Sequence, residues 1–91
     1  MNQLARLNTA NVYPNPSDQY VTISYSLLGA QAGTYISVFD GLGREKEKRI
    51  IGEVYEGQEL FNTRKMPNGI YFYQILQKGK KVHDGKFVVT H

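Results

Sequence analysis

Residues 20–27 alternate strictly between two kinds of side chain. Val21, Ile23 and Tyr25 are apolar, and the residues between them are threonine or serine. A period of two with β-branched and aromatic residues predicts a strand with one buried face. No segment of useful length has the 3.6-residue period of a helix, which favours an all-β fold.

Similar segments recur along the chain, with turn residues between them. The expected strands are 12–13, 20–27, 34–40, 44–51, 54–61, 70–77 and 81–90. Residues 70–77 are apolar on both faces, which is typical of a strand in the middle of a sheet, and we expect Asp84 and Gly85 to interrupt the last strand. About seven short strands with close turns predict an immunoglobulin-like antiparallel β-sandwich.

Composition limits the size and the chemistry of this protein. With 91 residues, one domain is expected, and the absence of cysteine excludes disulfides, thiol nucleophiles and zinc–thiolate sites. No apolar run approaches the roughly 20 residues of a membrane-spanning helix, and the N-terminus lacks the apolar core of a signal peptide. We therefore expect no membrane insertion, and we expect an exported protein of this kind to carry its signal peptide far upstream of this fragment.

The net charge of +3 is spread over interleaved residues. Residues 45–49 mix acidic and basic side chains, which is typical of a solvated strand face. A tighter basic group, Lys78, Lys80 and Lys81, lies at an expected hairpin turn, where basic residues usually serve solubility. We expect no nucleic-acid partner.

Four short motifs follow one another from the first expected strand to the last. They are Tyr13-Pro14-Asn15-Pro16, Phe39-Asp40-Gly41-Leu42-Gly43-Arg44, Met66-Pro67-Asn68-Gly69-Ile70-Tyr71 and Lys86-Phe87-Val88-Val89. The two prolines of the first motif fit only an edge or a turn, because they remove two backbone donors. Gly43 and Gly69 fit positions of special backbone geometry, and Tyr71 fits a core position with its hydroxyl at the rim.

In this order and spacing the motifs resemble those of the type A C-terminal sorting domain of the bacterial type IX, or Por, secretion system. The resemblance covers residues 12–91 and leaves residues 1–11 as a linker or lead-in. Its motif and recognition residues here are Tyr13, Pro14, Asn15, Pro16, Asp40, Gly43, Arg44, Pro67, Gly69, Tyr71, Lys86, Phe87, Val88 and Val89. Two positions depart from the family: Met66 replaces the usual Leu, and His91 stands where Lys or Arg is more usual.

The resemblance implies a non-catalytic secretion signal for a larger passenger protein that precedes it in the same polypeptide. Such a domain folds in the periplasm and is recognised by the type IX machinery, including its outer-membrane translocon. A sortase-like cysteine protease then removes it, and the passenger is anchored to the cell surface or is extracellular. No cofactor is implied.

The last expected strand is our candidate for the recognition element. It lies at the C-terminus, and a terminal strand can pair with the edge of a partner's sheet. We therefore expect residues 86–90 and their exposed edge to carry recognition.

Catalytic chemistry has little support in the sequence. His83 and Asp84 form the one adjacent His–carboxylate pair, but neighbouring strand residues point to opposite faces. No Gly-x-Ser-x-Gly motif surrounds a serine, and His83 and His91 lack a third metal ligand at useful spacing. We expect no enzyme activity and no metal.

Two binding functions remain open as alternatives. A β-sandwich module could hold a carbohydrate or a protein on exposed tyrosines, for which Tyr13, Tyr20, Tyr35 and Tyr55 are candidates. An oligonucleotide-binding barrel would need aromatic residues beside basic ones. The segment from Lys78 to Lys81 near Tyr73 is a weak match to that pattern.

Overall fold

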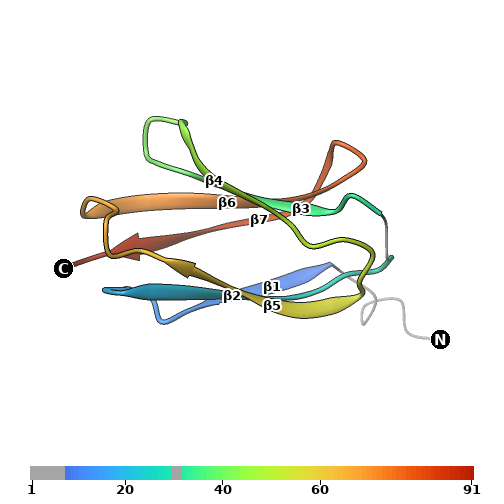
Figure 1. The fold of residues 1–91 in the computed structure, drawn as a ribbon, viewed down its shortest axis with the longest axis horizontal. Helices are drawn as coiled ribbons and strands as arrows, with labels where there is room; N and C mark the ends of the chain where they lie inside the picture. The colour runs from blue at the N-terminus through green and yellow to red at the C-terminus, as the bar shows by residue number, and fades with distance from the viewer. Residues whose placement is uncertain (1–7, 30–31) are drawn as a thin grey trace.

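The computed structural model describes residues 8–29 and 32–91, which form seven strands and no helix (Figure 1). The strands are β1 (Thr9–Tyr13), β2 (Tyr20–Ser26), β3 (Tyr35–Phe39), β4 (Glu45–Ile50), β5 (Glu56–Asn62), β6 (Gly69–Gln77) and β7 (Lys80–Val89).

The strands form two antiparallel sheets that pack face to face (Figure 1). One sheet has the order β1-β2-β5 and the other the order β4-β3-β6-β7. This arrangement confirms the expected antiparallel β-sandwich. The strand order is immunoglobulin-like, with β4 added beside β3 to the sheet that also holds β6 and β7.

The core lies between the two sheets. It is built from the inward-facing residues, which occupy alternate positions along the strands. Val21 and Ile23 of β2 and Ile36 and Val38 of β3 are fully buried, as their alternation predicts. Tyr25 is 5% exposed. The remaining buried apolar residues are Leu27, Phe61, Met66, Tyr71, Tyr73, Ile75, Phe87 and Val89.

Strand β6 lies between β3 and β7, as its two apolar faces predict. Its inward residues, Tyr71, Tyr73 and Ile75, are buried in the core. Its outward residues are different, because Ile70 is 50% and Phe72 is 44% exposed. The strand is therefore central within its sheet, yet part of its outer apolar surface faces solvent.

The expected interruption of the last strand at Asp84 and Gly85 is wrong. Both residues pair with β6, and the register shift instead lies between Ile75 and Leu76, opposite residues 81–83. Gly85 pairs directly with Tyr73. A Cβ at position 85 would lie 2.6 Å from a ring carbon of Tyr73, so glycine is required there for close approach of the ring rather than for a break in the strand.

The first strand begins earlier than the sequence suggests. Thr9 pairs with Ser26, so residues 9–11 of the expected lead-in belong to β1. Residues 1–7 of that lead-in lie outside the described part. Tyr13 ends β1, and Pro14 and Pro16 follow it at the edge of the sheet, as expected.

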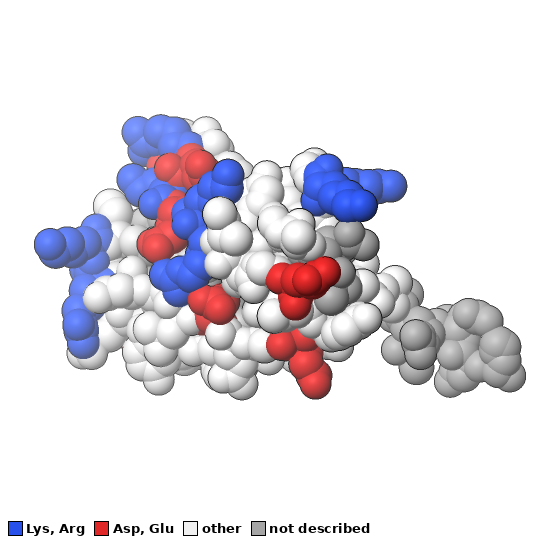
Figure 2. Space-filling model, turned by 45° about the vertical axis from the view of Figure 1, so that its right-hand side comes forward, with Lys and Arg blue, Asp and Glu red and all other residues white. Residues whose placement is uncertain are grey.

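The acidic and basic side chains that alternate along β4 form ion pairs. Arg49 contacts the carboxylates of Glu47 at 3.0 Å and Glu59 at 3.3 Å, and its guanidinium lies 4.2 Å from the centre of the Phe61 ring. The face drawn in Figure 2 has a band of mixed basic and acidic side chains, with smaller groups of each sign apart from it. The charge pattern therefore supports the solvated strand face that the sequence predicts.

We predict that Gly85→Ala lowers the free energy of unfolding by about 1–3 kcal/mol, because the added methyl group overpacks against the Tyr73 ring. Urea denaturation measures this cost. In a Tyr73→Leu background the same change should cost less, because Leu lacks the ring-tip atoms that the methyl group would meet. Equal costs in both backgrounds would show that the ring does not select glycine.

Candidate functional site

The four sequence motifs gather at one end of the sandwich. β1 and β7 end there, β3 ends there before the turn into β4, and β6 begins there (Figure 1). The segment between β5 and β6, which holds Met66 and Pro67, closes the same end. We call this region the motif end.

Hydrogen bonds join the first motif and the residue that follows it to the end of β7. The Ser17 amide donates to the Val88 carbonyl at 2.8 Å, and the Thr90 amide donates to the Ser17 carbonyl at 2.8 Å. The Val88 amide donates to the Asn15 side-chain oxygen at 3.0 Å. The segment from Asn15 to Ser17 therefore covers the outer edge of β7 where that strand ends; we call these contacts the Ser17 clasp.

Ser17 is also fixed from its side-chain end. Ser17 is 1% exposed, and its hydroxyl donates to the Thr63 hydroxyl at 3.4 Å. Thr63 is fully buried and donates in turn to the Asp18 carbonyl at 3.2 Å. Buried hydroxyls need such partners, because an unpaired polar group in the interior is costly. Sequence reasoning missed both residues, since serine and threonine beside turns have no distinctive pattern.

The second motif forms a turn around the carboxylate of Asp40. One carboxylate oxygen accepts the backbone amides of Leu42 and Arg44, each at 2.9 Å, and the other accepts the Arg44 Nε at 2.8 Å. The hydrogen bond from the Arg44 amide is the main reason that the pKa of Asp40 is below its ordinary value, with the Arg44 side chain adding to it. Gly43 has a φ of +83°, a conformation that favours glycine.

The third motif fixes the start of β6. The Tyr71 hydroxyl donates to the Pro67 carbonyl at 2.6 Å, which is the tyrosine-corner contact of immunoglobulin-like sandwiches. The Tyr71 ring stacks on Phe87 of the fourth motif, with 5.7 Å between centroids. Burial raises the pKa of Tyr71, and the nearby Asp40 carboxylate adds to the shift. Tyr71 is therefore a core residue with its hydroxyl at the rim, as expected.

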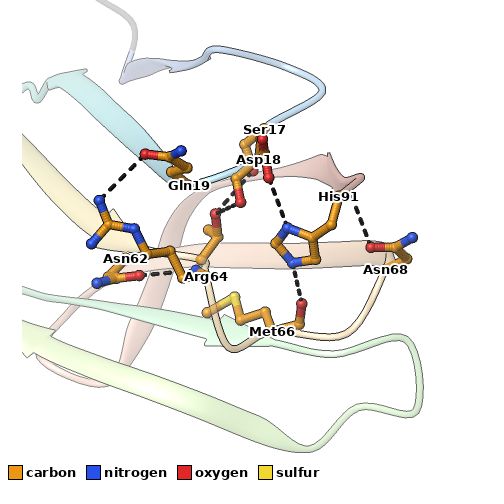
Figure 3. Close-up of polar contacts among 9 residues, drawn as sticks. Ser17, Asp18, Gln19, Asn62, Arg64, Met66, Asn68 and His91 are labelled. Carbon is orange, nitrogen blue, oxygen red and sulfur yellow. Dashed lines mark hydrogen bonds and ion pairs between the residues drawn. The ribbon is translucent and has the colours of Figure 1, made fainter.

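His91 fastens the C-terminus to two other segments (Figure 3). Its Nδ1 lies 2.9 Å from the Asp18 carboxylate and its Nε2 lies 2.8 Å from the Met66 carbonyl. Its backbone amide donates to the Asn68 side chain at 3.0 Å. Both ring nitrogens face acceptors, so the imidazolium fits best, and the hydrogen bond with Asp18, followed by that with Met66, raises the pKa of His91.

The side chains of the fourth motif divide between the core and the surface. Phe87 and Val89 are fully buried, whereas Lys86 is exposed and Val88 is 36% exposed. The expected exposed edge is wrong for residues 88–90, because the Ser17 clasp covers it. Deleting residues 87–91 would therefore remove part of the core together with any recognition surface.

The four tyrosines considered for a binding module do not form one surface. Tyr13 and Tyr20 lie in the three-stranded sheet, and Tyr35 lies in the other sheet with Lys48 over its ring. The Tyr55 carbonyl accepts the Leu27 amide beyond the end of β2 that is remote from the motif end.

The features of an oligonucleotide-binding barrel are also not brought together. Tyr73, the aromatic residue expected beside Lys78–Lys81, is 2% exposed and covers Gly85. A ring in that position has no free face on which a base could stack.

The two residues of the candidate catalytic pair, His83 and Asp84, contact different neighbours. The Asp84 carboxylate binds the Lys81 ammonium at 2.7 Å, and the His83 ring lies 6.2 Å from the Tyr73 ring centre. Within residues 8–29 and 32–91, no three His, Cys, Asp or Glu side chains group as metal ligands. The same part of the chain contains no helix long and apolar enough to cross a membrane.

Comparison with known proteins gives one match. The family model described as a secretion system C-terminal sorting domain matches residues 11–90. No curated protein and no solved structure matches the chain. The match covers every strand from the end of β1 to β7, and all four motifs.

We predict that Asp40→Ala lowers the urea midpoint of unfolding clearly more than Arg44→Ala does. Removing the carboxylate leaves two backbone amides without their acceptor, whereas removing the Arg44 side chain breaks only an exposed ion pair. Because the pKa of Asp40 is lowered on folding, its contribution is present at neutral pH and is lost as pH falls through that pKa. Equal midpoints for the two variants would contradict this account of the turn.

We predict a pH-dependent contribution from His91. Its pKa is raised on folding, so its contribution is fully present below the unfolded value of 6.5 and is lost as pH rises through the folded value. The difference in unfolding free energy between the parent and His91→Gln, measured by urea denaturation, should be larger at about pH 5.5 than at about pH 8.5. His83 is present in both proteins, so any contribution that it makes cancels in this difference. A difference that is the same at both pH values would rule out the ion pair with Asp18.

Proposed function

The chain belongs to the C-terminal sorting domains of the Por, or type IX, secretion system, and from this we propose how it acts as a secretion signal. The family is non-catalytic and directs secretion through the outer membrane by interaction with the secretion machinery. We propose that this domain carries an upstream passenger through the outer-membrane translocon. A sortase-like cysteine protease then removes the domain and leaves the passenger on the cell surface or in the medium.

The observation that supports this proposal most is the match of the family model to residues 11–90. The position of the motifs in the fold adds to it. Residues that are far apart in the chain, such as Asn15, Asp40, Tyr71 and Val88, lie at one end of the sandwich, where hydrogen bonds connect the first motif with the fourth. A signal of this kind exists only in the folded domain, which fits recognition after folding in the periplasm.

The motif residues divide into two groups by burial. Asp40, Tyr71, Phe87 and Val89 are at most 8% exposed and keep the motif end folded. Lys86 and Val88 point outward between the buried residues of β7. We propose that the machinery reads outward side chains of this end, while the buried motif residues act indirectly by maintaining its shape.

We place the cleavage site before Thr9. Residues 9–13 pair with residues 22–26 of β2, and a strand held in a ladder does not enter a protease site as readily as an exposed linker. This restricts the expected lead-in of residues 1–11 to its first part and keeps β1 with the sorting domain.

We predict that residues 1–91 are sufficient to export a passenger. A signal peptide and a fluorescent protein would be fused in front of them and expressed in a bacterium with the type IX machinery. Fractionation should find the passenger on the surface or in the medium, shortened by about the 10.4 kDa of this domain, and a strain without the translocon should retain it in the periplasm. Retention in the periplasm of both strains would contradict the proposed function.

A further inference from the structure

The outer face of the four-stranded sheet has an apolar surface at the motif end. It consists of Leu42, Ile70, Phe72 and Val88, which are 79%, 50%, 44% and 36% exposed. Ile70 lies directly opposite Val88 in the β6–β7 ladder, and Leu42 and Ile70 line the same hollow. We call these four residues the outer-face patch.

Hollows adjoin the outer-face patch, and two of them are lined by a lysine side chain. One has a volume of about 390 Å³ and is lined by Leu42, Arg44, Lys46 and Ile70, among others. The other has a volume of about 430 Å³ and is lined by Phe72 and Lys86, which pair in the β6–β7 ladder. Phe72 also lines a further hollow of about 360 Å³ that has no lysine in its lining. Ile70 and Phe72 therefore form an exposed ridge with hollows beside it, a shape that a complementary partner can contact.

The carboxylates around the patch are in ion pairs, whereas two of its lysines are not. Of the carboxylates that line these hollows, Asp40 is paired with Arg44 and Asp84 is paired with Lys81. Lys46 and Lys86 form no ion pair with any residue of the described part. Each of the two lysine-lined hollows thus offers one cation that lacks a counter-charge.

The neighbouring carboxylate of Glu45 does not alter this pattern. Glu45 precedes Lys46 in β4 but lines neither of these two hollows, and its carboxylate accepts the Ser37 hydroxyl at 2.7 Å. The positive sign also disfavours a second copy of this chain, since two such faces would bring like charges together.

We propose that the outer-face patch is a docking site for a protein of the secretion machinery that presents an apolar strip flanked by carboxylates. The apolar strip covers the ridge of Ile70 and Phe72, and the carboxylates pair with Lys46 and Lys86. Apolar anchors surrounded by complementary charge are the usual form of a specific protein interface. This inference rests on the proposed function and adds to it the surface that the machinery reads.

The test compares glutamate variants in the exported fusion described above. Phe72→Glu disrupts the ridge, and Lys86→Glu reverses one flanking charge without touching the core. The matched controls are Leu60→Glu, at a residue 56% exposed on the other sheet, and Lys80→Glu, at the remote end of β7. Thermal unfolding of each purified domain establishes that the variants fold, and Lys86→Glu keeps the test valid if Phe72→Glu is unstable.

The expected result is that Phe72→Glu and Lys86→Glu each reduce the exported fraction by about tenfold, the loss that one interface hot spot produces. The two controls should stay within about twofold of the parent, as peripheral substitutions do. The conservative variant Lys86→Arg should be exported like the parent, because it keeps the positive charge.

Three outcomes would overturn the inference. Normal export of both patch variants would exclude this face while leaving the proposed function intact. Failure of the unchanged fusion to be exported would reject the proposed function and this inference with it. Sedimentation of the parent domain as a dimer that Phe72→Glu dissociates would assign the patch to a second copy instead.

Discussion

The Ser17 clasp is the contact on which the motif end depends. Ser17 uses its amide and carbonyl on the edge of β7 and its hydroxyl on Thr63, which follows β5. It thereby connects the segment between β1 and β2 with the end of each sheet. A small sandwich buries a limited core, and this buried polar contact adds a connection between its two sheets at that end.

The dispersed motifs share a physical role with the clasp, because each of them stabilises the motif end. Asn15 covers an amide of β7, Asp40 closes the turn after β3, and Tyr71 joins Pro67 to Phe87 through a hydrogen bond and a ring contact. Each of these contacts either joins residues that are not neighbours in the sequence or stabilises a turn. The motifs are therefore parts of one folded end of the sandwich.

Much of the fold could be predicted because it depends on local pattern. The alternation in residues 20–27 and the two apolar faces of residues 70–77 identify an inward-facing strand and a central one, and the glycine turn after Asp40 is equally local. The Ser17–Thr63 contact and the position of His91 could not be predicted, since they join residues more than 20 positions apart. The break predicted at Gly85 is wrong because glycine often interrupts a strand, whereas this glycine leaves space for the Tyr73 ring of the neighbouring strand.

The claim that the motif end is one hydrogen-bonded unit can be tested most directly by native-state amide hydrogen exchange. The amides of Ser17, Val88, Thr90 and His91 should be protected together in the parent domain. Asn15→Ala should weaken the protection of this set while leaving the β3–β6 ladder unchanged. Rapid, independent exchange of the Ser17 and Thr90 amides in the parent would contradict the account, because the last strand would then lie free of the first motif.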